Sequence, residues 1–559
     1  MRYLFLFLLS FLFLAGCGGG GTTSQTPQSD ATQATTPSDT NATPNTHQAN
    51  TPTIPQTQSC TVKLTTNDTI QDAIDNAQSE AVICLEAGVY NQGAVFIRNK
   101  EGLTLKGVVA PDKTNDANPK GAILSAKGAK NNYYGFITIQ NSSRITISNL
   151  VVEDAKGSDS VGILVQGSDS VTLSDNLIQR TNSSAILLLG DTDRSTSPTT
   201  ITRFNTNITI QNNKIVHANV AGDNSGNEAL SISATDGFEI SYNEVTHKDQ
   251  NGVLDGYKEG VDIKDGSRNG SLHNNNLHDI SKNCIYIDGW EHHTYNIEIY
   301  QNRVVDCGIG GVRGFGISVA SERNGEVENI FIHNNFIANV NTTYYSGIAV
   351  TTGAGQKSYD KNPIHNIAII NNTITNTYSG IFISENFQDF KSFANIVVAN
   401  NLVDGVDTKG GYLLGAKNIE YTTRNGGDIG NAYQNSLYNF EDFRIYNNAL
   451  RVYKDKGWDE YSDFRESAKD SVKLSDNTSL ISTSPTSSIA LQTTMSQLKE
   501  RGYSDIMSLV ESFNDVGEFA MSADEVSRFV SNFQTHFNQD YNHNPRFNGT
   551  IDIGAQEEQ

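Results

Sequence analysis

The sequence predicts an all-β chain wound as a parallel β-helix, a solenoid built from short strands. Three observations support this prediction. The 559 residues include 47 Gly and only 11 Pro, and 37% are apolar, which suits a long, turn-rich β structure better than a helical or disordered chain. An alternating strand followed by asparagine recurs along the sequence, and a second alternating strand lies between its copies.

The first repeated unit is an alternating strand followed by asparagine and an apolar residue, as in ITIQNNKI at Ile208 and IFIHNNFI at Ile330. Most successive copies are 27 to 37 residues apart. A buried column of asparagines can satisfy turn backbone groups from coil to coil, so we expect these side chains to stack. The asparagines at this position are Asn149, Asn176, Asn213, Asn243, Asn275, Asn302, Asn335, Asn372, Asn401 and Asn448.

The second unit is a small residue followed by alternating apolar positions, as in GVDIK at Gly260, CIYID at Cys284 and GISVA at Gly316. Two short strands per period, with a conformationally special turn after one of them, describe one coil of a parallel β-helix. Inward apolar residues then stack as ladders. At about 4.8 Å per coil, ten coils would make a rod about 50 Å long.

Both ends of the repeat carry features of their own. Thr69–Ala77 has helical apolar spacing and is expected to form a helix that caps the open end of the solenoid; LEAGVY follows it. This block resembles the N-terminus of pectate-lyase-like right-handed parallel β-helix proteins, and Asn544–Glu557 resembles the closing strand of many secreted members. The resemblance covers roughly residues 60–450 plus that tail. It implies a single-stranded right-handed β-helix but no single activity, because lyases, hydrolases, epimerases and adhesins share the fold.

Composition divides the chain into four parts. Residues 1–17 are typical of a signal peptide, and their last four residues, LAGC, resemble the bacterial lipobox, in which the cysteine, here Cys17, becomes lipidated. Residues 18–59 are rich in Thr, Gln, Ser and Pro and are expected to form a flexible tether. We assign residues 60–452 to the β-helix. Residues 453–559 form a C-terminal segment with a helical part and the closing strand.

These features predict an exported, monomeric lipoprotein that is anchored to a bacterial membrane, at the outer membrane or the cell surface. The chain has 40 Lys and Arg against 62 Asp and Glu, a net charge of −22. Nucleic acids and anionic membrane surfaces need a basic face, so neither is an expected partner. Contact with a membrane is expected through the lipid anchor only.

The four cysteines after Cys17 fall into two pairs. Cys60 and Cys84 are 24 residues apart, and Cys284 and Cys307 are 23 apart, each close to one turn of the repeat. Export permits disulfides. Each pair could therefore form a disulfide or pack as two adjacent thiols.

The candidate site is a charged patch on the outward face of two consecutive coils. Outward side chains at equal positions of successive coils form columns about 4.8 Å apart, and two mostly uncharged columns here hold Asp262, Lys264, Tyr286 and Asp288. A salt-bridged surface is the plain alternative, but polar clusters of mixed charge on a rigid scaffold are where perturbed pKa values arise. The patch contains Asp255, Lys258, Glu259, Asp262, Lys264, Asp265, Arg268, Tyr286, Asp288, Trp290, Glu291, His292, His293, Arg313, Glu322 and Arg323.

This patch suits the eliminative cleavage of a uronic acid polymer, an acidic polysaccharide. The reaction needs a cation near the C5 carboxylate, a base for the α-proton and an acid for the leaving oxygen. Lys264 is the leading base candidate, Arg268 or Arg313 would lie near the carboxylate, and Tyr286 and His292 could act as acid. The candidates for substrate binding are Lys258, Trp290, His293, Glu322 and Arg323, with Trp290 available to stack on a sugar ring.

Calcium is the expected cofactor. The segment VDIKDGS resembles the pectate-lyase strand in which an aspartate ligates Ca²⁺, and this resemblance carries over to Asp262 alone. Asp265, Asp288 and Glu259 complete the set on chemical grounds, because Ca²⁺ prefers oxygen ligands. Zinc is not expected, since adjacent histidines on a strand face opposite ways.

Two other functions remain open. A glycoside hydrolase would use paired carboxylates, and Asp262 and Asp288 would lie about 5 to 8 Å apart on adjacent coils. A non-catalytic glycan-binding adhesin would be expected to spread aromatic residues along the rod. Here titratable groups peak over two or three coils, which favours an extracytoplasmic enzyme that cleaves a uronate-containing polysaccharide by Ca²⁺-assisted β-elimination.

Overall fold

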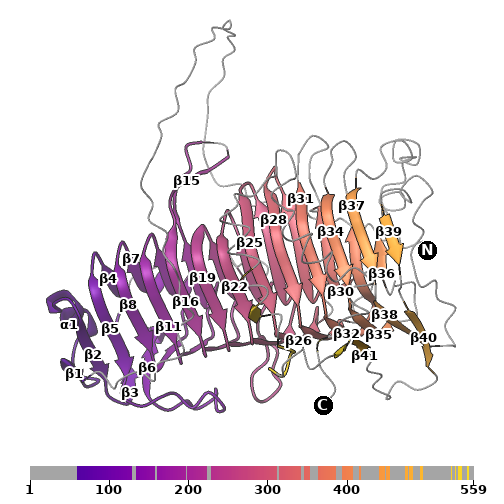
Figure 1. Cartoon of the computed structure of the whole chain (residues 1–559). Helices are drawn as coiled ribbons and strands as arrows, with labels where there is room; N and C mark the ends of the chain where they lie inside the picture. Colours follow the sequence, from indigo (N-terminus) through magenta and orange to yellow (C-terminus); the bar gives the residue numbers. More distant parts are fainter. Residues whose placement is uncertain are drawn as a thin grey trace, which may run out of the picture. The chain divides into compact units, whose positions relative to one another are not determined.

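The chain is a right-handed parallel β-helix, as the sequence predicted (Figure 1). The computed structural model describes residues 59–128, 134–157, 160–196, 198–222, 228–310, 314–340, 345–352, 363–384 and 393–406, with shorter pieces between 414 and 555. The predicted signal peptide, Cys17 and nearly all of the tether lie outside these residues. No helix in the described part is long and apolar enough to cross a membrane.

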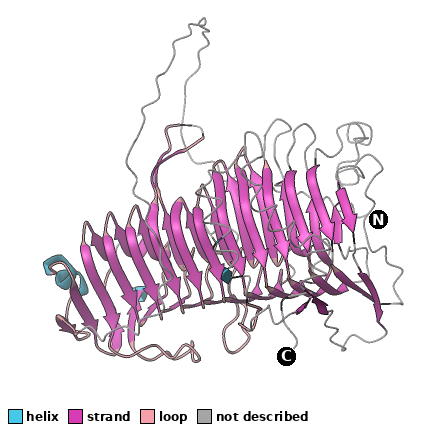
Figure 2. Cartoon of the chain, viewed as in Figure 1, coloured by secondary structure: helices cyan, strands magenta, loops and turns pink. Residues whose placement is uncertain are grey.

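The coils from β2 to β36 each contribute one strand to each of three parallel sheets, which run along the rod (Figure 2). Sheet A consists of β1 (Val62–Leu64), β2 (Ala81–Leu85), β5 (Glu101–Gly107), β8 (Ser143–Ser148), β11 (Asp169–Ser174), β16 (Asn205–Gln211), β19 (Thr235–Ser241), β22 (Arg268–His273), β25 (His293–Tyr300), β28 (Glu326–His333), β31 (Ile364–Ile370), β34 (Phe393–Ala399), β37 (Phe440–Tyr446) and β39 (Val472–Ser475).

Sheets B and C complete the coil. Sheet B consists of β3 (Gly88–Tyr90), β6 (Ala122–Ser125), β9 (Leu150–Glu153), β12 (Leu177–Gln179), β17 (Lys214–Val216), β20 (Glu244–Thr246), β23 (Asn276–Ile280), β26 (Arg303–Cys307), β29 (Phe336–Val340), β32 (Thr373–Thr377), β35 (Leu402–Val406), β38 (Ala449–Tyr453) and β40 (Thr478–Ser482). Sheet C consists of β4 (Val95–Arg98), β7 (Gly135–Gln140), β10 (Val161–Gln166), β13 (Ile186–Leu189), β18 (Leu230–Ser233), β21 (Val261–Lys264), β24 (Ile285–Trp290), β27 (Ile317–Glu322), β30 (Ser346–Thr352), β33 (Ser379–Ser384) and β36 (Leu414–Ala416).

A few elements lie outside the sheets. The predicted cap helix is α1 (Ile70–Asn76), which buries Ile70 and Ile74 against the first coils, and a short 3-10 helix, η1, spans Ala126–Gly128. Two small antiparallel pairs are β14 (Asp191–Asp193) with β15 (Thr200–Arg203), and β41 (Gln492–Thr494) with β42 (Thr550–Asp552).

The C-terminal part differs from the sequence prediction in two ways. Strands β39 and β40 pair in parallel with the preceding coil. The β-helix therefore extends beyond residue 452, where the sequence predicted its end. The predicted closing strand contains β42, but this strand pairs antiparallel with β41 rather than adding to a main sheet. The predicted helical part lies almost entirely outside the described residues.

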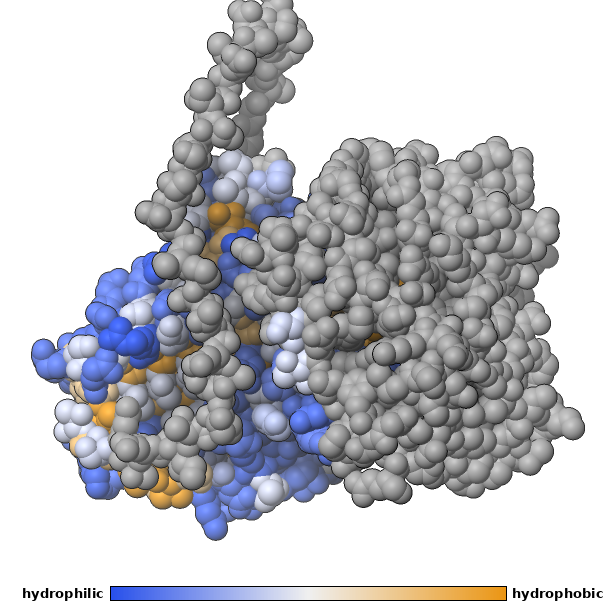
Figure 3. Space-filling view, in the orientation of Figure 1, coloured by the Kyte–Doolittle hydropathy of each residue, from blue (hydrophilic) through white to orange (hydrophobic). Residues whose placement is uncertain are grey.

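The interior is a set of apolar ladders. One inward position of sheet C is occupied in every coil from β10 to β33 by an aliphatic residue that is at most 1% exposed, and each pairs in register with the next. These residues are Val165, Leu188, Ile232, Ile263, Ile287, Val319, Val350 and Ile383. The visible surface of the N-terminal coils is by contrast mostly hydrophilic, with scattered apolar patches (Figure 3).

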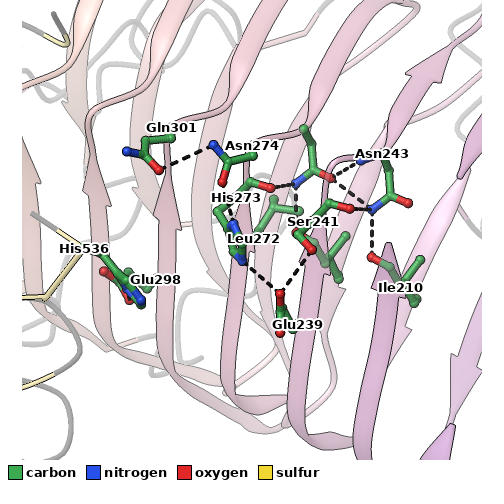
Figure 4. Close-up of polar contacts among 12 residues, drawn as sticks. Ile210, Glu239, Ser241, Asn243, Leu272, His273, Asn274, Glu298, Gln301 and His536 are labelled. Carbon is green, nitrogen blue, oxygen red and sulfur yellow. Dashed lines mark hydrogen bonds and ion pairs between the residues drawn. The ribbon is translucent and has the colours of Figure 1, made fainter. Parts of the chain in front are cut away.

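The asparagine ladder runs from Asn176 to Asn448 between sheets A and B. At each step the backbone N–H and the side-chain amide donate to the Oδ1 atom of the next asparagine, over 2.9 to 3.1 Å. Figure 4 shows the step at Asn243, whose amide also donates to the carbonyl of Ile210. Asn149 is not a member. It lies one residue too early, with a φ of 55°, and Leu150 fills the ladder position.

Two disulfides bind neighbouring parts of the helix. Cys60 is bonded to Cys84 near the capped end, and Cys284 is bonded to Cys307 in the middle of the rod. Since disulfides persist in oxidising compartments, these bonds indicate an exported protein.

Candidate functional site

The predicted charged patch lies on the outer face of sheet C. The strands pair in the register that the sequence predicted, with equal positions of successive coils side by side. Asp262 pairs with Ser231 on one side and Tyr286 on the other, and Lys264 pairs with Ser233 and Asp288. Strand β13, between β10 and β18, is not recognisable as a copy of the second unit, because its run of four aliphatic residues hides the alternation. The four central residues of the patch therefore occupy two adjacent coils.

Lys264 is the centre of the patch. Its side chain is 14% exposed, and its Nζ atom lies 2.5 Å from Oε2 of Glu228 and 3.0 Å from Oδ2 of Asp262. Burial lowers the pKa of Lys264, but the carboxylates of Asp262 and Glu228 outweigh burial and raise it well above the usual value. Lys264 therefore holds its proton at neutral pH, which makes it a poor base.

Glu228 was not part of the predicted site. Although burial raises the pKa of this carboxyl, the charge of Lys264 and its hydrogen bond outweigh burial and lower it to about 2. The N–H of Ala229 bonds to the carbonyl of Glu259 on the next coil, so Glu228 and Glu259 precede equivalent strands. That equivalence is visible in the sequence and could have identified Glu228.

Asp262 and Asp288 form a pair of strongly perturbed carboxyls. Burial is the largest cause that raises the pKa of each. The charge of Lys264 opposes this shift at Asp262, whereas the neighbouring Glu322 adds to it at Asp288. The Oδ1 atoms of both are buried, and among the described residues neither has a hydrogen-bond partner. These carboxyls thus keep their protons to higher pH than ordinary aspartates do.

Tyr286 and Glu322 form a hydrogen-bonded pair beside these carboxyls. The Tyr286 hydroxyl donates to Oε1 of Glu322 over 2.7 Å. Burial, followed by the charges of Asp288 and Glu322, raises the pKa of Tyr286. Burial also raises the pKa of Glu322, against the hydrogen bond from Tyr286, which lowers it. Glu322 thus accepts a proton more readily than a solvated carboxylate does.

An aromatic surface adjoins this pair. Trp290 lies opposite Glu322 in the register of β24 and β27. The Cζ atom of Arg323 lies 4.1 Å from the centre of the Trp290 ring, and its Nη1 atom is 3.5 Å from Oε1 of Glu291. The guanidinium thus covers one face of the Trp290 ring, and the two side chains form a platform at the end of β24.

Several predicted residues lie around the edge of the patch. Asp265 accepts a hydrogen bond from Ser233 over 2.9 Å, and its Oδ1 atom is 3.9 Å from Nδ1 of His292. The backbone carbonyl of Lys258 accepts bonds from Ser281 and Lys282. Glu259 is half-buried near Glu228, and burial followed by that charge raises its pKa. These residues lie in the turns that precede and follow the strands of the patch.

Other predicted residues are not brought to the centre. Arg268 belongs to sheet A, where its Nε atom is 2.9 Å from Oδ2 of Asp236 and its guanidinium covers the ring of Phe204. Arg313 lies outside the described residues. His293 also belongs to sheet A, where its ligand atom and those of Glu326 and Glu328 lie within 4.8 Å of one another, a possible metal-binding group. The metal ligands predicted from the sequence do not include His293.

The predicted calcium site does not fit the arrangement around Asp262. A Ca²⁺ ion needs six to eight oxygen ligands, whereas the Oδ2 atom of Asp262 already faces the ammonium of Lys264 at 3.0 Å. An ammonium held between two carboxylates repels a dication. The positive charge of this patch is supplied by Lys264.

Comparisons with known proteins bear on the fold. A family model described as "Right handed beta helix region" matches residues 161–364. No curated protein sequence matches the chain.

The solved structures that resemble the chain include enzymes of polysaccharide metabolism. The mannuronan C-5 epimerase AlgE6 A-module of Azotobacter vinelandii is 12% identical, with 74% of this chain and 94% of that chain covered and a TM-score of 0.50. The AlgE4 A-module of the same organism is 11% identical, with 75% of this chain and 94% of that chain covered and a TM-score of 0.46. An exopolygalacturonase of Thermotoga maritima is 11% identical, with 62% of this chain and 87% of that chain covered and a TM-score of 0.41. The likeness is one of fold.

Proposed function

We propose that this chain is an exported enzyme that cleaves a uronate-containing polysaccharide by β-elimination at the patch on sheet C. One observation carries the proposal. The half-buried Tyr286–Glu322 pair lies beside the charged Lys264, on a face whose next coil has Ser318 and Ala320 at the equivalent positions. The likeness to the mannuronan epimerases is one of fold, so the support for the proposal comes from these residues.

Lys264 and Asp288 are suited to bind the substrate carboxylate. The ammonium supplies a fixed positive charge, and the raised pKa of Asp288, to which burial and the charge of Glu322 contribute, favours its neutral form. A neutral carboxyl donates a hydrogen bond to an anion instead of repelling it. Together these groups withdraw charge from the substrate carboxylate and make the proton on C5 more acidic.

Tyr286 is suited to move the proton. As its oxygen removes the C5 proton, its own phenolic proton passes to Glu322, whose pKa is raised. The C4–O bond then breaks, its electron pair leaves with the oxygen, and a C4–C5 double bond forms. The leaving oxygen takes up a proton, which Tyr286 can return from the Glu322 side. Trp290 and Arg323 would hold the adjoining sugar ring.

The test is the ultraviolet absorbance of the unsaturated uronate that elimination creates. The purified full chain is incubated with pectate, alginate and glycosaminoglycans, and Tyr286→Phe is compared with Tyr242→Phe, a matched change at an exposed tyrosine. We expect Tyr286→Phe to lower kcat by at least about a hundredfold and Tyr242→Phe to leave it unchanged. Chelation of Ca²⁺ should have no effect, because Lys264 carries the charge. Equal rates in both variants would exclude this role of Tyr286.

Glycoside hydrolysis is the second candidate. It is favoured by two carboxyl groups on adjacent coils whose pKa values are both raised. Asp262 and Asp288 differ by one coil and two residues in register, a separation that can hold a water between acid and base. New reducing ends without ultraviolet absorbance would establish hydrolysis. If a polymer is retained by the chain but neither signal appears, the patch is a binding surface.

The proposal also includes lipid anchoring at Cys17, which rests on the sequence LAGC. The anchored chain would act on polymer outside the cytoplasm, and the tether would let the β-helix extend away from the membrane. Membrane fractionation of Cys17→Ser tests this. Retention of the variant in the membrane fraction would contradict it.

A further inference from the structure

A second polar group lies where sheet A begins, apart from the patch on sheet C. His293 is the first residue of β25 and pairs in register with Glu326, the first residue of β28. Glu328 lies two residues further on, so both glutamates project from the same face of their strand. One donor atom from each of these three side chains lies within 4.8 Å of the others.

The orientation of His293 is the first indication of a ligand. Its Nε2 atom lies 2.8 Å from Oε2 of Glu328 and 3.9 Å from Oε1 of Glu326. This nitrogen is buried, yet among the described residues it has no partner with hydrogen-bond geometry. The ring is held by stacking on Tyr295, with 4.4 Å between the ring centres. One nitrogen and two carboxylates therefore face a common point.

The partners of the two glutamates are the second indication. Nε2 of His365, whose side chain is 1% exposed, lies 2.8 Å from Oε1 of Glu326. The amide of Asn366 donates to Oε1 of Glu328 over 3.4 Å. Carboxylates that ligate metals are in turn held by such outer hydrogen bonds, which fix their orientation. Here each carboxylate has its own outer partner on β31.

We propose that His293, Glu326 and Glu328 bind one divalent transition-metal ion of the zinc type. The donor set decides the class, because imidazole nitrogen together with carboxylate oxygen suits Zn²⁺ and its neighbours, whereas Ca²⁺ takes oxygen ligands. Three protein ligands leave at least one coordination position of such an ion open to a further ligand. This inference does not depend on the proposed lyase activity.

The site lies close in sequence to the patch on sheet C. His293 follows Trp290 after a turn of two residues, and Glu326 follows Glu322 after a turn of three. A metal ion would therefore join the two turns at which the Trp290 platform and the Tyr286–Glu322 pair end. The alternative is a metal-free ion pair between a protonated His293 and the glutamates.

Calorimetric titration of the full chain with Zn²⁺ separates these possibilities, with Co²⁺ absorption in the visible range as a second readout. His293→Ala is the test variant. His278→Ala is the matched control, because that ring also meets two carboxylates, but at opposite nitrogens. Nδ1 of His278 is 2.9 Å from Asp279, and its Nε2 is 3.4 Å from Glu244. One ion cannot use both of those contacts.

We expect one Zn²⁺ per chain in the wild type and in His278→Ala, and at least about tenfold weaker binding in His293→Ala. Excess Ca²⁺ should not displace the ion. Glu328→Gln, which keeps the shape of the side chain, provides an independent test should His293→Ala fail to fold. No zinc binding in the wild type, or equal affinity in His293→Ala and Glu328→Gln, would overturn the proposal in favour of the ion pair.

Discussion

The asparagine ladder and the charged patch are both columns of polar side chains on the same coils, yet they satisfy their polar groups to different degrees. In the ladder, each amide donates to the coils beside it and its oxygen accepts two bonds, as at Asn302. In the patch, Asp262 and Asp288 each bury an oxygen that has no partner among the described residues. The hydrogen-bonding capacity of the ladder is filled, whereas that of the patch is not.

The chemical cause of this difference is the side chain itself. An amide carries both a donor and an acceptor, so identical residues can stack from coil to coil without a partner of another kind. Carboxylates carry only acceptors when ionised, so neighbours must take up protons or share a cation such as Lys264. The same β-helix thus gains stability from the asparagine ladder, while the charged patch holds groups with perturbed pKa values.

Removal of the shared cation should give the largest effect. Lys264→Met leaves Glu228 and Asp262 buried without their counter-charge, and breaking a buried pair in this way costs about 3–5 kcal/mol. We expect that loss at neutral pH in urea unfolding followed by tryptophan fluorescence. The matched control is Lys248→Met, whose partially exposed pair with Asp279 should contribute at most about 1 kcal/mol.

The same variant should respond to pH in a defined direction. The pKa of Glu228 is lowered to about 2 in the folded protein, so its contribution is present above its unfolded value and is lost as pH falls through about 2. The difference between wild type and Lys264→Met should therefore shrink toward about pH 3. A difference that stays constant would mean that Lys264 stabilises through packing.

Interruption of the ladder should give the next largest effect. Asn302→Ala removes the acceptor of the Asn275 backbone N–H and the donor to the Leu272 carbonyl. Each buried group left without a partner costs about 1–3 kcal/mol, so we expect a loss of about 3 kcal/mol in the free energy of unfolding. Asn276 is in the adjoining strand, and among the described residues its side chain bonds only to Arg303, so Asn276→Ala should stay within about 0.5 kcal/mol. Equal losses would show that the ladder carries no special stability.

Much of this comparison was predictable from sequence. The repeat predicted the fold and the pairing of Asp262 with Tyr286, because a parallel β-helix converts sequence period directly into spatial register. The α1 cap was predicted separately, from the helical spacing of its apolar residues. Asn149 was misplaced by one residue, since its copy of the repeat carries leucine where the others carry the ladder asparagine. Wherever the repeat was regular, the sequence thus predicted which face of the β-helix a side chain occupies.

The interactions within the site were less predictable. The sequence placed Lys264 on the outer face but could not show that Glu228 and Asp262 surround it, and it therefore assigned Lys264 the role of base. The contact between Glu298 and His536 joins residues 238 positions apart, which no repeat specifies. Long-range contacts of that kind require the folded chain.

That contact supports the last and smallest prediction, a pH dependence of the C-terminal segment. The carboxylate of Glu298 is buried, and its two oxygens lie 2.8 Å from Nε2 of His333 and Nδ1 of His536 (Figure 4 shows Glu298 and His536). Burial lowers the pKa of His536, but the hydrogen bond to Glu298 and the charges of Glu298 and Glu239 outweigh burial and raise it. The ring also stacks on Tyr300.

A raised pKa means that His536 contributes stability that is complete below its unfolded value and is lost as pH rises through the folded one. Amide hydrogen exchange should therefore show greater protection of residues 539–543 at about pH 6 than at about pH 9, after correction for intrinsic rates. These residues also bond to Gln301 and Asn334, so the effect should be modest. Glu298→Gln should abolish the difference between the two pH values, whereas Glu239→Gln should only reduce it. Protection that is independent of pH in the wild type would mean that His536 is held by its stacking on Tyr300 and not by its charge.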